Sequence, residues 1–383
     1  MAPITIDHPA RVERLWAKLD EHRLDLVFLP ASQSDFEYFT GVARRAPSFG
    51  GIGYANHWIS GAFIAPGTPP LYVLTKHYQD FDMPAGMTGD VITARDGDDG
   101  GALFAQALDR FGGGQRRIGV ASRSWAETSI ALAALRPAAE IVVADRATNE
   151  LRRIKDADEI ELMRQAAGIV DLVYSEIEPT VVVGVTELEL ASRIDLRMRQ
   201  LGSPGPSFDT GVFALGPGLV RDADVRVSTE APPRGSAVSF DFGAIAQGYC
   251  NDFGRTVHLG DPSEEYERVY DLVIAAQEAG RAAAVPGATG SDVHAATRAV
   301  IVDGGYGEWF RHRTGHCIGL DVHELPYISE EDHTPLEPGM LFTIEPSVFW
   351  PGRVGVRVED VFLLTENGAE AINRHPHAMV ANR

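Results

Sequence analysis

The segment FRHRTGHCIGLDVHE, residues 310–324, contains His312, His316 and His323, three of the 12 histidines in the 383-residue chain. Neutral imidazole binds metal ions and also titrates near neutral pH. A histidine cluster of this kind therefore indicates a metal site, acid–base chemistry or both. A polar loop that merely carries histidines is the alternative, and the rest of the chain has to decide between the two readings.

Composition and charge limit the class of protein. The chain of 383 residues is long enough for two domains, and its 44% hydrophobic and 23% charged residues are typical of a soluble globular protein. The net charge of −20 disfavours nucleic acid and anionic membranes as partners, because both bind basic surfaces. We see no apolar run that would span a bilayer, no signal-peptide pattern and only two cysteines, which together favour a cytoplasmic location.

The first 150 residues alternate between helical and strand-like patterns. Val12, Leu15, Trp16 and Leu19 fall at i, i+3, i+4 and i+7, which predicts an amphipathic helix over 8–22. Further helices are expected at 34–41, 100–111 and 125–135, and strands at 25–30, 62–65, 71–75, 117–121 and 140–144. This alternation predicts an α/β domain over residues 1–150.

A change of pattern near residue 148 marks the expected domain boundary. Residues 148–177 place Ile160, Met163 and Val170 on one helical face, with acidic residues near its start, where they suit a helix N-terminus. We therefore assign residues 151–383 to a second domain. In it we expect helices at 187–201, 264–280 and 292–303, a Gly/Pro-rich connection at 201–218, and strands at 237–243, at 250–258 and within 336–368.

Four carboxylates of the second domain stand in strand-like or loop segments. Asp241 interrupts VSFDFG, Asp252 follows it by 11 residues, Glu345 interrupts LFTIEP and Glu359 interrupts VGVRVEDVF. A buried carboxylate is costly unless it is paired or bound to a metal ion. Each of them alone could be a strand residue that faces solvent. Together with His316, however, they have the ligand types of a two-metal hydrolytic site.

The ligand types also indicate which metals would bind. Hard oxygen ligands with one imidazole suit Mn²⁺, Co²⁺, Fe²⁺ or Zn²⁺, and four carboxylates balance the charge of two divalent ions. We therefore expect two divalent metal ions, with Mn²⁺ as the first choice. Cys250 and Cys317 lie close in sequence to these residues, but a nucleophilic thiol needs a lowered pKa and access. We expect both cysteines to be packing residues.

Four motifs in this order, DFGAIAQGYCNDFGRT, HRTGHCIGLDVHE, TIEP and RVED, resemble those of the pita-bread metallopeptidases. That family includes aminopeptidase P, Xaa-Pro dipeptidase (prolidase), methionine aminopeptidase, creatinase and ectoine hydrolase. The resemblance covers residues 150–383, and the N-terminal domain with the linking segment LRRIKDADEIELMRQAA resembles the creatinase/aminopeptidase P branch. It implies an α+β pita-bread catalytic domain after a creatinase-like α/β domain, and a homodimer.

The resemblance implies a role for each motif residue. His312 and His323 would bind substrate or stabilise the developing oxyanion, with structural polar contacts as the alternative. Arg357 would orient the site, because partners of metal ligands fix their geometry. Glu345 would accept a proton from the attacking water in addition to binding metal. The implied metal ligands are Asp241, Asp252, His316, Glu345 and Glu359, of which Asp252 and Glu359 would bridge both ions.

One position departs from the family's pattern. The family usually places a substrate-facing histidine about 17 residues before the first aspartate, yet no histidine lies between Leu201 and Asp241 in this chain. Charged residues stand there instead: Arg221, Asp222, Asp224 and Arg226. We expect them to form an exposed loop, with recognition of a polar or zwitterionic small molecule as the alternative.

The expected activity is metal-dependent hydrolysis of an Xaa-Pro or related peptide bond. A small-molecule C–N hydrolase or lyase of the creatinase or ectoine hydrolase type is the second hypothesis, which the missing histidine favours. A non-enzymatic binding protein on the same fold is the third, and the complete ligand set argues against it. The expected partner is a small peptide or a small-molecule amide.

Overall fold

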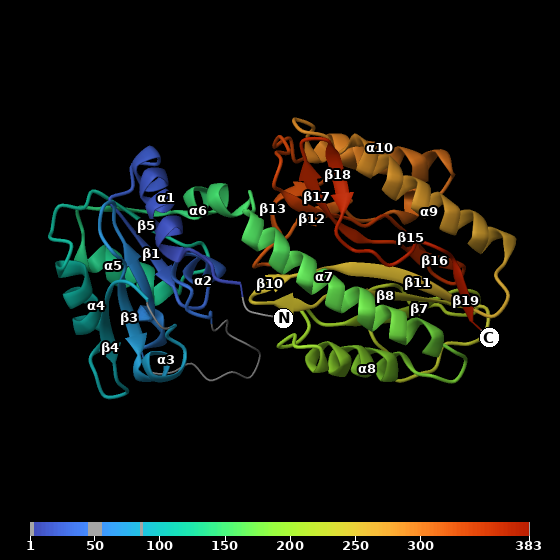
Figure 1. Ribbon diagram of the computed structural model, residues 1–383, viewed down its shortest axis with the longest axis horizontal. Coiled ribbons are helices and arrows are strands. Elements are labelled where there is room, and N and C mark those ends of the chain that lie inside the picture. Colours follow the sequence, from blue (N-terminus) through green and yellow to red (C-terminus); the bar gives the residue numbers. More distant parts are fainter. Residues whose placement is uncertain (1–3, 45–55, 85–86, 383) are drawn as a thin grey trace. The chain divides into compact units, whose positions relative to one another are not determined.

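The computed structural model describes residues 4–44, 56–84 and 87–382 (Figure 1). The chain divides into two compact units, Thr5–Arg152 and Arg153–Arg383, and Ile4 belongs to the second. Within the described residues, none of the helices combines the length and the apolar character that a bilayer crossing requires.

The N-terminal unit is built on a mixed sheet of order β4-β3-β2-β1-β5-β6. Strand β1 pairs parallel with β5 and antiparallel with β2. The strands are β1 (Leu26–Pro30), β2 (Gly61–Ile64), β3 (Leu71–Thr75), β4 (Asp90–Ala94), β5 (Arg117–Val120) and β6 (Glu140–Val143). The helices are α1 (His8–Glu21), α2 (Ser34–Thr40), η1 (His57–Ile59), α3 (Lys76–Phe81), α4 (Gly100–Asp109), α5 (Ala126–Leu135) and α6 (Asp145–Arg152). Phe28 and Phe63 of the sheet pack against Phe104 of α4, so the α/β layering is that expected.

Three features of this region differ from the prediction. Strand β4 and helix α3 were not anticipated, because their segments show neither a long apolar run nor a clear helical period. The helical pattern over 148–177 is divided into α6 and α7 (Ala157–Ile177). Asp156 begins α7 with a capping box, in which its Oδ1 accepts from Glu159 N at 2.9 Å while Glu159 Oε2 accepts from Asp156 N at 3.0 Å.

The C-terminal unit contains two larger sheets, of orders β19-β11-β8-β7 and β13-β12-β14-β17-β18. The first is formed by β7 (Gly211–Leu215), β8 (Ala237–Phe242), β11 (Phe253–Leu259) and β19 (Val380–Asn382). The second is formed by β12 (Gly315–Cys317), β13 (Glu324–Ile328), β14 (Leu341–Ile344), β17 (Asp360–Thr365) and β18 (Gly368–Ala371). Two hairpins complete the unit, β9 (Ile245–Ala246) with β10 (Tyr249–Cys250) and β15 (Ser347–Trp350) with β16 (Val354–Arg357).

Two pairs of helices cover these strands. Helices α7 and α8 (Glu187–Gln200) bury Tyr174 and Ile194 against Phe240 and its neighbours on the first sheet. Helices α9 (Glu264–Ala283) and α10 (Gly290–Asp303) pack on β14 to β17, as Figure 1 shows within this unit. Short 3₁₀ turns lie at η2 (Glu178–Thr180) and η3 (Gly307–Trp309).

The connection between the two predicted strands at 237–258 is more elaborate than expected. It forms the β9–β10 hairpin, whose two turn residues Gln247 and Gly248 have φ of +43° and +87°. A two-residue hairpin turn of this handedness needs positive φ at both positions, which explains the glycine. Strand β7 was missed altogether, because its five buried residues lie within the Gly/Pro-rich span that predicted a loop.

The two larger sheets meet at a glycine. Gly254 of β11 forms an antiparallel bridge with Glu359, with Glu359 N donating to Gly254 O at 2.9 Å. A Cβ atom at position 254 would lie 2.8 Å from Glu359 Oε2 and 3.0 Å from Glu359 Cβ, so a larger residue there would displace the Glu359 side chain. The bridge brings segments about a hundred residues apart to one place, which is where the predicted site residues gather.

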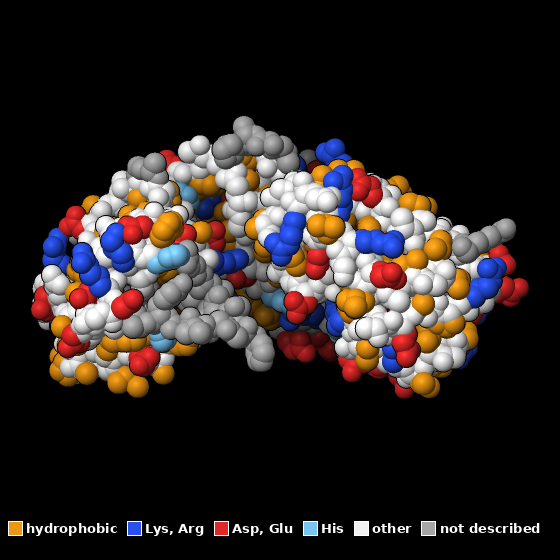
Figure 2. Space-filling view, turned by 90° about the horizontal axis from the view of Figure 1, so that it is seen from below, with side chains coloured by type: hydrophobic (Ala, Val, Ile, Leu, Met, Phe, Trp, Pro, Cys, Tyr) orange, Lys and Arg blue, Asp and Glu red, His pale blue; other side chains and the backbone are white. Residues whose placement is uncertain are grey.

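Charged side chains are interspersed over the surface. On the face shown in Figure 2, Lys and Arg alternate with Asp and Glu on each unit. The described surface shown there is therefore mixed in sign, although the chain has a net charge of −20.

Candidate active site

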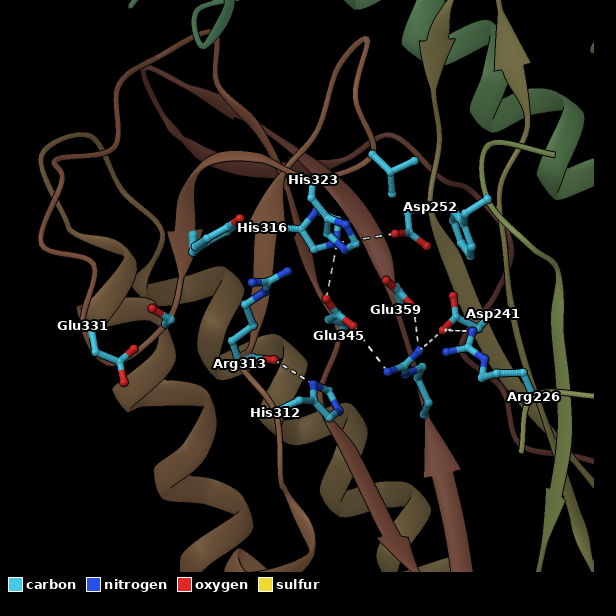
Figure 3. Close-up of a pocket in the computed structure, with 15 residues that line it drawn as sticks. Arg226, Asp241, Asp252, His312, Arg313, His316, His323, Glu331, Glu345 and Glu359 are labelled. Atoms are coloured by element: carbon cyan, nitrogen blue, oxygen red, sulfur yellow. Dashed lines mark hydrogen bonds and ion pairs between the residues drawn. The ribbon is translucent and has the colours of Figure 1, made fainter. Parts of the chain in front are cut away.

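The five predicted metal-ligand residues come from five different segments of the C-terminal unit. Asp241 lies on β8, Asp252 between β10 and β11, His316 on β12, Glu345 directly after β14, and Glu359 between β16 and β17. All five are buried, with exposed fractions of 1–8%. They line one pocket of about 610 Å³, into which their side chains point (Figure 3).

Distances within this pocket are short. One carboxylate oxygen each from Asp241, Asp252 and Glu359 lie within 4.8 Å of one another. His316 Nε2 lies 3.5 Å from Asp252 Oδ2 and 3.6 Å from Glu345 Oε1. The structure thus brings the four carboxylates and the imidazole to one centre.

Hydrogen bonds fix the orientation of His316 and Glu345. His316 Nδ1 lies 3.2 Å from the carbonyl oxygen of Cys317, to which it donates in the tautomer that leaves Nε2 free. The Thr343 hydroxyl accepts from His316 N at 3.1 Å and donates to Glu345 Oε1 at 3.3 Å. Such supporting contacts are typical of metal sites, because they orient the ligand atoms.

The crowded carboxylates raise one another's pKa. Burial and the neighbouring charges of Asp252 and Asp241 raise the pKa of Glu345 to about 7, although Arg357 and His316 act in the opposite direction. Burial, with repulsion from Asp252 and Glu345, also raises the pKa of Glu359 well above its ordinary value. Positive charge placed among these groups would relieve the repulsion.

Two arginines hold Asp241. Its Oδ2 accepts from Arg226 Nη2 at 2.6 Å and also from Arg357 Nη1. Burial alone would raise the pKa of Asp241, but the charges of Arg357 and Arg226 hold it below the ordinary value. Arg357 Nη2 also lies 3.4 Å from Glu345 Oε2, and its Nη1 lies 3.7 Å from Glu359 Oε2. Arg357 therefore contacts three of the four carboxylates.

The donor set fits divalent cations. Asp252 Oδ1 and Glu359 Oε2 are buried and accept no hydrogen bond from the described residues. Buried carboxylate oxygens are normally satisfied, and an ion is one of the partners that can satisfy them. These two oxygens belong to the two residues that the sequence predicted as bridging ligands, next to a free imidazole nitrogen.

The two flanking histidines are held near the cluster as neutral groups. His312 Nδ1 lies 2.7 Å from the carbonyl oxygen of Arg313, and its Nε2 lies 2.6 Å from the Ser347 hydroxyl. Burial and the charge of Arg357 lower the pKa of His312 to about 3. The ring centroids of His323 and His316 lie 4.1 Å apart. Burial, with the positive charges of His316 and Arg313, lowers the pKa of His323 to about 4.

Comparison with known proteins agrees with this site. The model of metallopeptidase family M24 matches residues 161–366. The chain belongs to metallopeptidase family M24. Its α/β domain followed by a pita-bread domain, and its resemblance to the Xaa-Pro peptidase branch, are therefore confirmed. Membership also implies bound metal ions, for which the M24 chain offers the buried Asp241, Asp252 and Glu359.

Relatives of the M24 chain include named peptidases. It is 36% identical to an Xaa-Pro dipeptidase of Pyrococcus furiosus over 235 residues, 60% of this chain and 66% of that protein. A prolidase structure from Thermococcus sibiricus superposes with a TM-score of 0.88 at 29% identity, covering 99% of this chain and 100% of the other. An X-Pro aminopeptidase structure from Thermotoga maritima superposes with a TM-score of 0.80 at 28% identity, covering 97% of this chain and 99% of the other.

Sequence reasoning missed part of the pocket. Phe208, Arg226, Arg313, Val322, Tyr327, Ser329 and Glu331 also line it. The expectation of an exposed loop at 221–226 is correct for Asp224 and for Arg226, although the Arg226 side chain, 44% exposed, also reaches Asp241. The concentration of charge at 221–226 was the available signal for Arg226. No comparable signal marked Arg313, which follows His312 as one more basic residue.

A buried ion pair supports the segment that carries His323. Lys155 Nζ lies 2.8 Å from Glu324 Oε2, with side-chain exposures of 1% and 8%, and Glu324 Oε1 accepts from Asp321 N at 3.2 Å. Glu324 follows His323 directly in the chain. Lys155 and Glu324 therefore fix the turn from which His323 projects.

Removing Lys155 should destabilise the C-terminal unit. We expect Lys155→Met to lower the free energy of unfolding by about 3–5 kcal/mol, because it leaves the Glu324 carboxylate buried without its cation. Arg153→Met is the matched control, since Arg153 and Glu337 pair with side-chain exposures of 31% and 49%. That variant should lose less than about 1 kcal/mol. Urea unfolding followed by tryptophan fluorescence measures both, and equal losses would contradict this description of the pair.

Proposed function

We propose that this protein is a dinuclear metal-dependent hydrolase of Xaa-Pro or related peptide bonds. The observation that carries the proposal is the pair of unsatisfied buried oxygens, Asp252 Oδ1 and Glu359 Oε2, with Nε2 of His316 3.5 Å from the other oxygen of Asp252. Divalent cations would satisfy both oxygens. The similarity to the Xaa-Pro dipeptidase of Pyrococcus furiosus supports the choice of substrate.

Five residues would hold two divalent ions, Mn²⁺ in the first place and Co²⁺, Fe²⁺ or Zn²⁺ otherwise. Bound ions of this kind supply a nucleophilic water near neutral pH and polarise the scissile carbonyl. The proposed ligands are Asp241, Asp252, His316, Glu345 and Glu359.

The remaining roles follow from the chain's own geometry. Glu345 would accept the proton of the attacking water, because it is a carboxylate within the cluster whose Oε1 lies 3.6 Å from His316 Nε2. His323 is a neutral imidazole at the edge of the cluster, so it can donate one hydrogen bond to the carbonyl oxygen of the substrate. His312 donates its one N–H to the carbonyl oxygen of Arg313 and accepts at Nε2 from the Ser347 hydroxyl, which favours for it the structural role that the sequence left open. Arg357 keeps Asp241, Glu345 and Glu359 in place through its ion pairs.

A substrate panel tests the proposal. We would assay chelator-treated protein with added Mn²⁺ against Ala-Pro, Gly-Pro, Ala-Ala and Ala-Pro-Ala. We expect release of proline from the two Xaa-Pro dipeptides, faster than cleavage of Ala-Ala, and no hydrolysis without added metal. Failure to cleave any member of the panel by protein that binds metal would exclude the peptidase reading.

The loop at 221–226 favours a second candidate. The usual histidine is absent, and Arg226 instead donates to Asp241 at the edge of the pocket. A C–N hydrolase or lyase acting on a small charged molecule, of the creatinase or ectoine hydrolase type, would use the same centre. Ectoine-like and guanidino compounds are therefore the next substrates to assay. The homodimer and the cytoplasmic location stay predictions.

A further inference from the structure

Three arginines line the pocket, and they differ in their partners. Arg226 and Arg357 both donate to Asp241 Oδ2, and Arg357 also pairs with Glu345 and Glu359. Arg313 forms no ion pair with a carboxylate among the described residues, although it borders the same pocket. It is thus the pocket cation whose charge is left for a ligand.

The position of Arg313 is fixed by an aromatic ring. Its Cζ atom lies 4.0 Å from the ring centroid of Tyr327, which is also a pocket residue. Stacking on an aromatic face holds a guanidinium in place and leaves its N–H edge free. In Figure 3 the Arg313 side chain points into the pocket between the levels of His312 and His323, while Glu331 lies farther from the carboxylate cluster.

The charge of the pocket favours an anionic ligand. Five carboxylates and three arginines line it, a formal charge of −2 before the histidines are counted. The two divalent cations of the proposed function would change this to +2. A pocket that becomes positive on loading attracts a substrate that carries a carboxylate.

The distance from the scissile bond determines which carboxylate of a peptide Arg313 would bind. In a dipeptide the terminal carboxylate carbon is about 2.5 Å from the scissile nitrogen, from the N–Cα and Cα–C bond lengths. In a longer peptide a neutral amide takes that place, and the charge lies at least one residue, about 3.3–3.6 Å, farther along. Arg313 lines the same pocket as the carboxylate cluster and points into it between the levels of His312 and His323, so it serves the near position.

We propose that Arg313, stacked on Tyr327, binds the free C-terminal carboxylate of a dipeptide and so makes this protein a dipeptidase and not an aminopeptidase of longer chains. The proposal rests on the proposed Xaa-Pro hydrolase function. It adds the substrate class and the residue that selects it. The similarity to both a prolidase and an X-Pro aminopeptidase structure leaves that choice open at the level of the fold.

The test compares substrates that differ only in the terminal charge. We would measure kcat/KM of Mn²⁺-loaded protein for Ala-Pro, its C-terminal amide and Ala-Pro-Ala. The parent should prefer the free acid at least about tenfold, the effect of one charged hydrogen-bonded contact. Arg313→Met should lower kcat/KM for Ala-Pro by about 10- to 100-fold and leave the amide within about twofold, whereas Arg313→Lys should keep part of the preference.

A binding measurement gives a readout that does not depend on turnover. Proline, the expected product, should raise the melting temperature of the parent protein more than prolinamide does, and Arg313→Met should remove that difference. Arg226→Met removes a different arginine of the same pocket, one that is paired with Asp241, and it should keep the difference between proline and prolinamide. Arg268→Met, on the exposed face of α9 and outside the pocket, is the control for loss of an arginine as such.

Each outcome separates the two proposals. Equal cleavage of acid and amide by the parent would overturn the carboxylate assignment and leave the Xaa-Pro hydrolase standing. A preference that persists in Arg313→Met, or that disappears only in Arg226→Met, would also overturn it. No cleavage of any of these substrates by metal-loaded protein would reject the proposed function, and the assignment of Arg313 with it.

Discussion

Asp252→Asn should abolish both hydrolysis and tight metal binding, while the chelator-treated variant should be at least as stable as the chelator-treated parent. Loss of a proposed ligand carboxylate should cost more than the about 10- to 100-fold that loss of an outer partner costs. The stability of the metal-free protein should not fall with the activity. Asp252 is 4% exposed, its Oδ1 has no hydrogen-bond donor, and its charge repels those of Asp241 and Glu359. An uncharged amide relieves that repulsion.

Calorimetry and turnover measurements together test whether the variant loses activity and metal binding while it keeps its stability. Mn²⁺ at 100 times its dissociation constant should stabilise the parent by about 2.7 kcal/mol and should leave the melting temperature of the variant unchanged. Asp261→Asn is the matched control, since the Asp261 side chain is 80% exposed and pairs with Arg234 at the surface. An Asp252→Asn protein that keeps its metal response, or that is several degrees less stable without metal, would contradict the description of the cluster.

Arg255→Met should lower the free energy of unfolding by about 3–5 kcal/mol and weaken metal binding at the same time. Arg255 and Asp360 are 2% and 1% exposed, and Arg255 Nη2 donates to Asp360 Oδ1 at 2.7 Å. Arg255 Nη1 also donates to the carbonyl oxygens of Gly254 and Glu359, each at 2.8 Å. The substitution thus removes the arginine partner of Asp360 Oδ1, leaves His377 and Gln277 on Oδ2, and releases the backbone that carries a proposed metal ligand.

Two further variants identify the cause. Arg255→Met combined with Asp360→Asn should recover part of the lost stability, because the buried charge that has lost its arginine is removed. The double variant should still bind metal about 10- to 100-fold more weakly than the parent, because the support of Glu359 is absent. Arg197→Met removes an exposed pair with Glu176 and should cost less than about 1 kcal/mol. A loss in Arg255→Met no larger than in Arg197→Met would show that the pair is not structural.

The metal-ligand candidates could be predicted from sequence because each stands in a short, distinctive local pattern. Asp241 and Glu359 interrupt apolar strand segments, and a charge in such a setting demands a partner. Long-range contacts had no such signal. The Lys155–Glu324 pair joins residues 169 positions apart, and Arg313 is distinguished from Arg311 only by facing the pocket.

The fold shows the same division between local and long-range information. The helix at 8–22 was expected from its apolar period and is observed at His8–Glu21. Strand β7 was missed because its glycine-bounded segment becomes a strand only through pairing with β8. The break between α6 and α7 could have been found in the sequence, since Asp156 and Glu159 have the spacing of a capping box.

A metal titration with turnover tests the central proposal most directly. Chelator-treated protein would receive Mn²⁺ in steps, and the number of ions bound per chain would be recorded beside the rate of proline release from Ala-Pro. We predict no release without metal and a plateau at about two ions per chain, the stoichiometry of a dinuclear site. Two ions bound without proline release, or release that chelation leaves unchanged, would contradict the account of a dinuclear Xaa-Pro hydrolase.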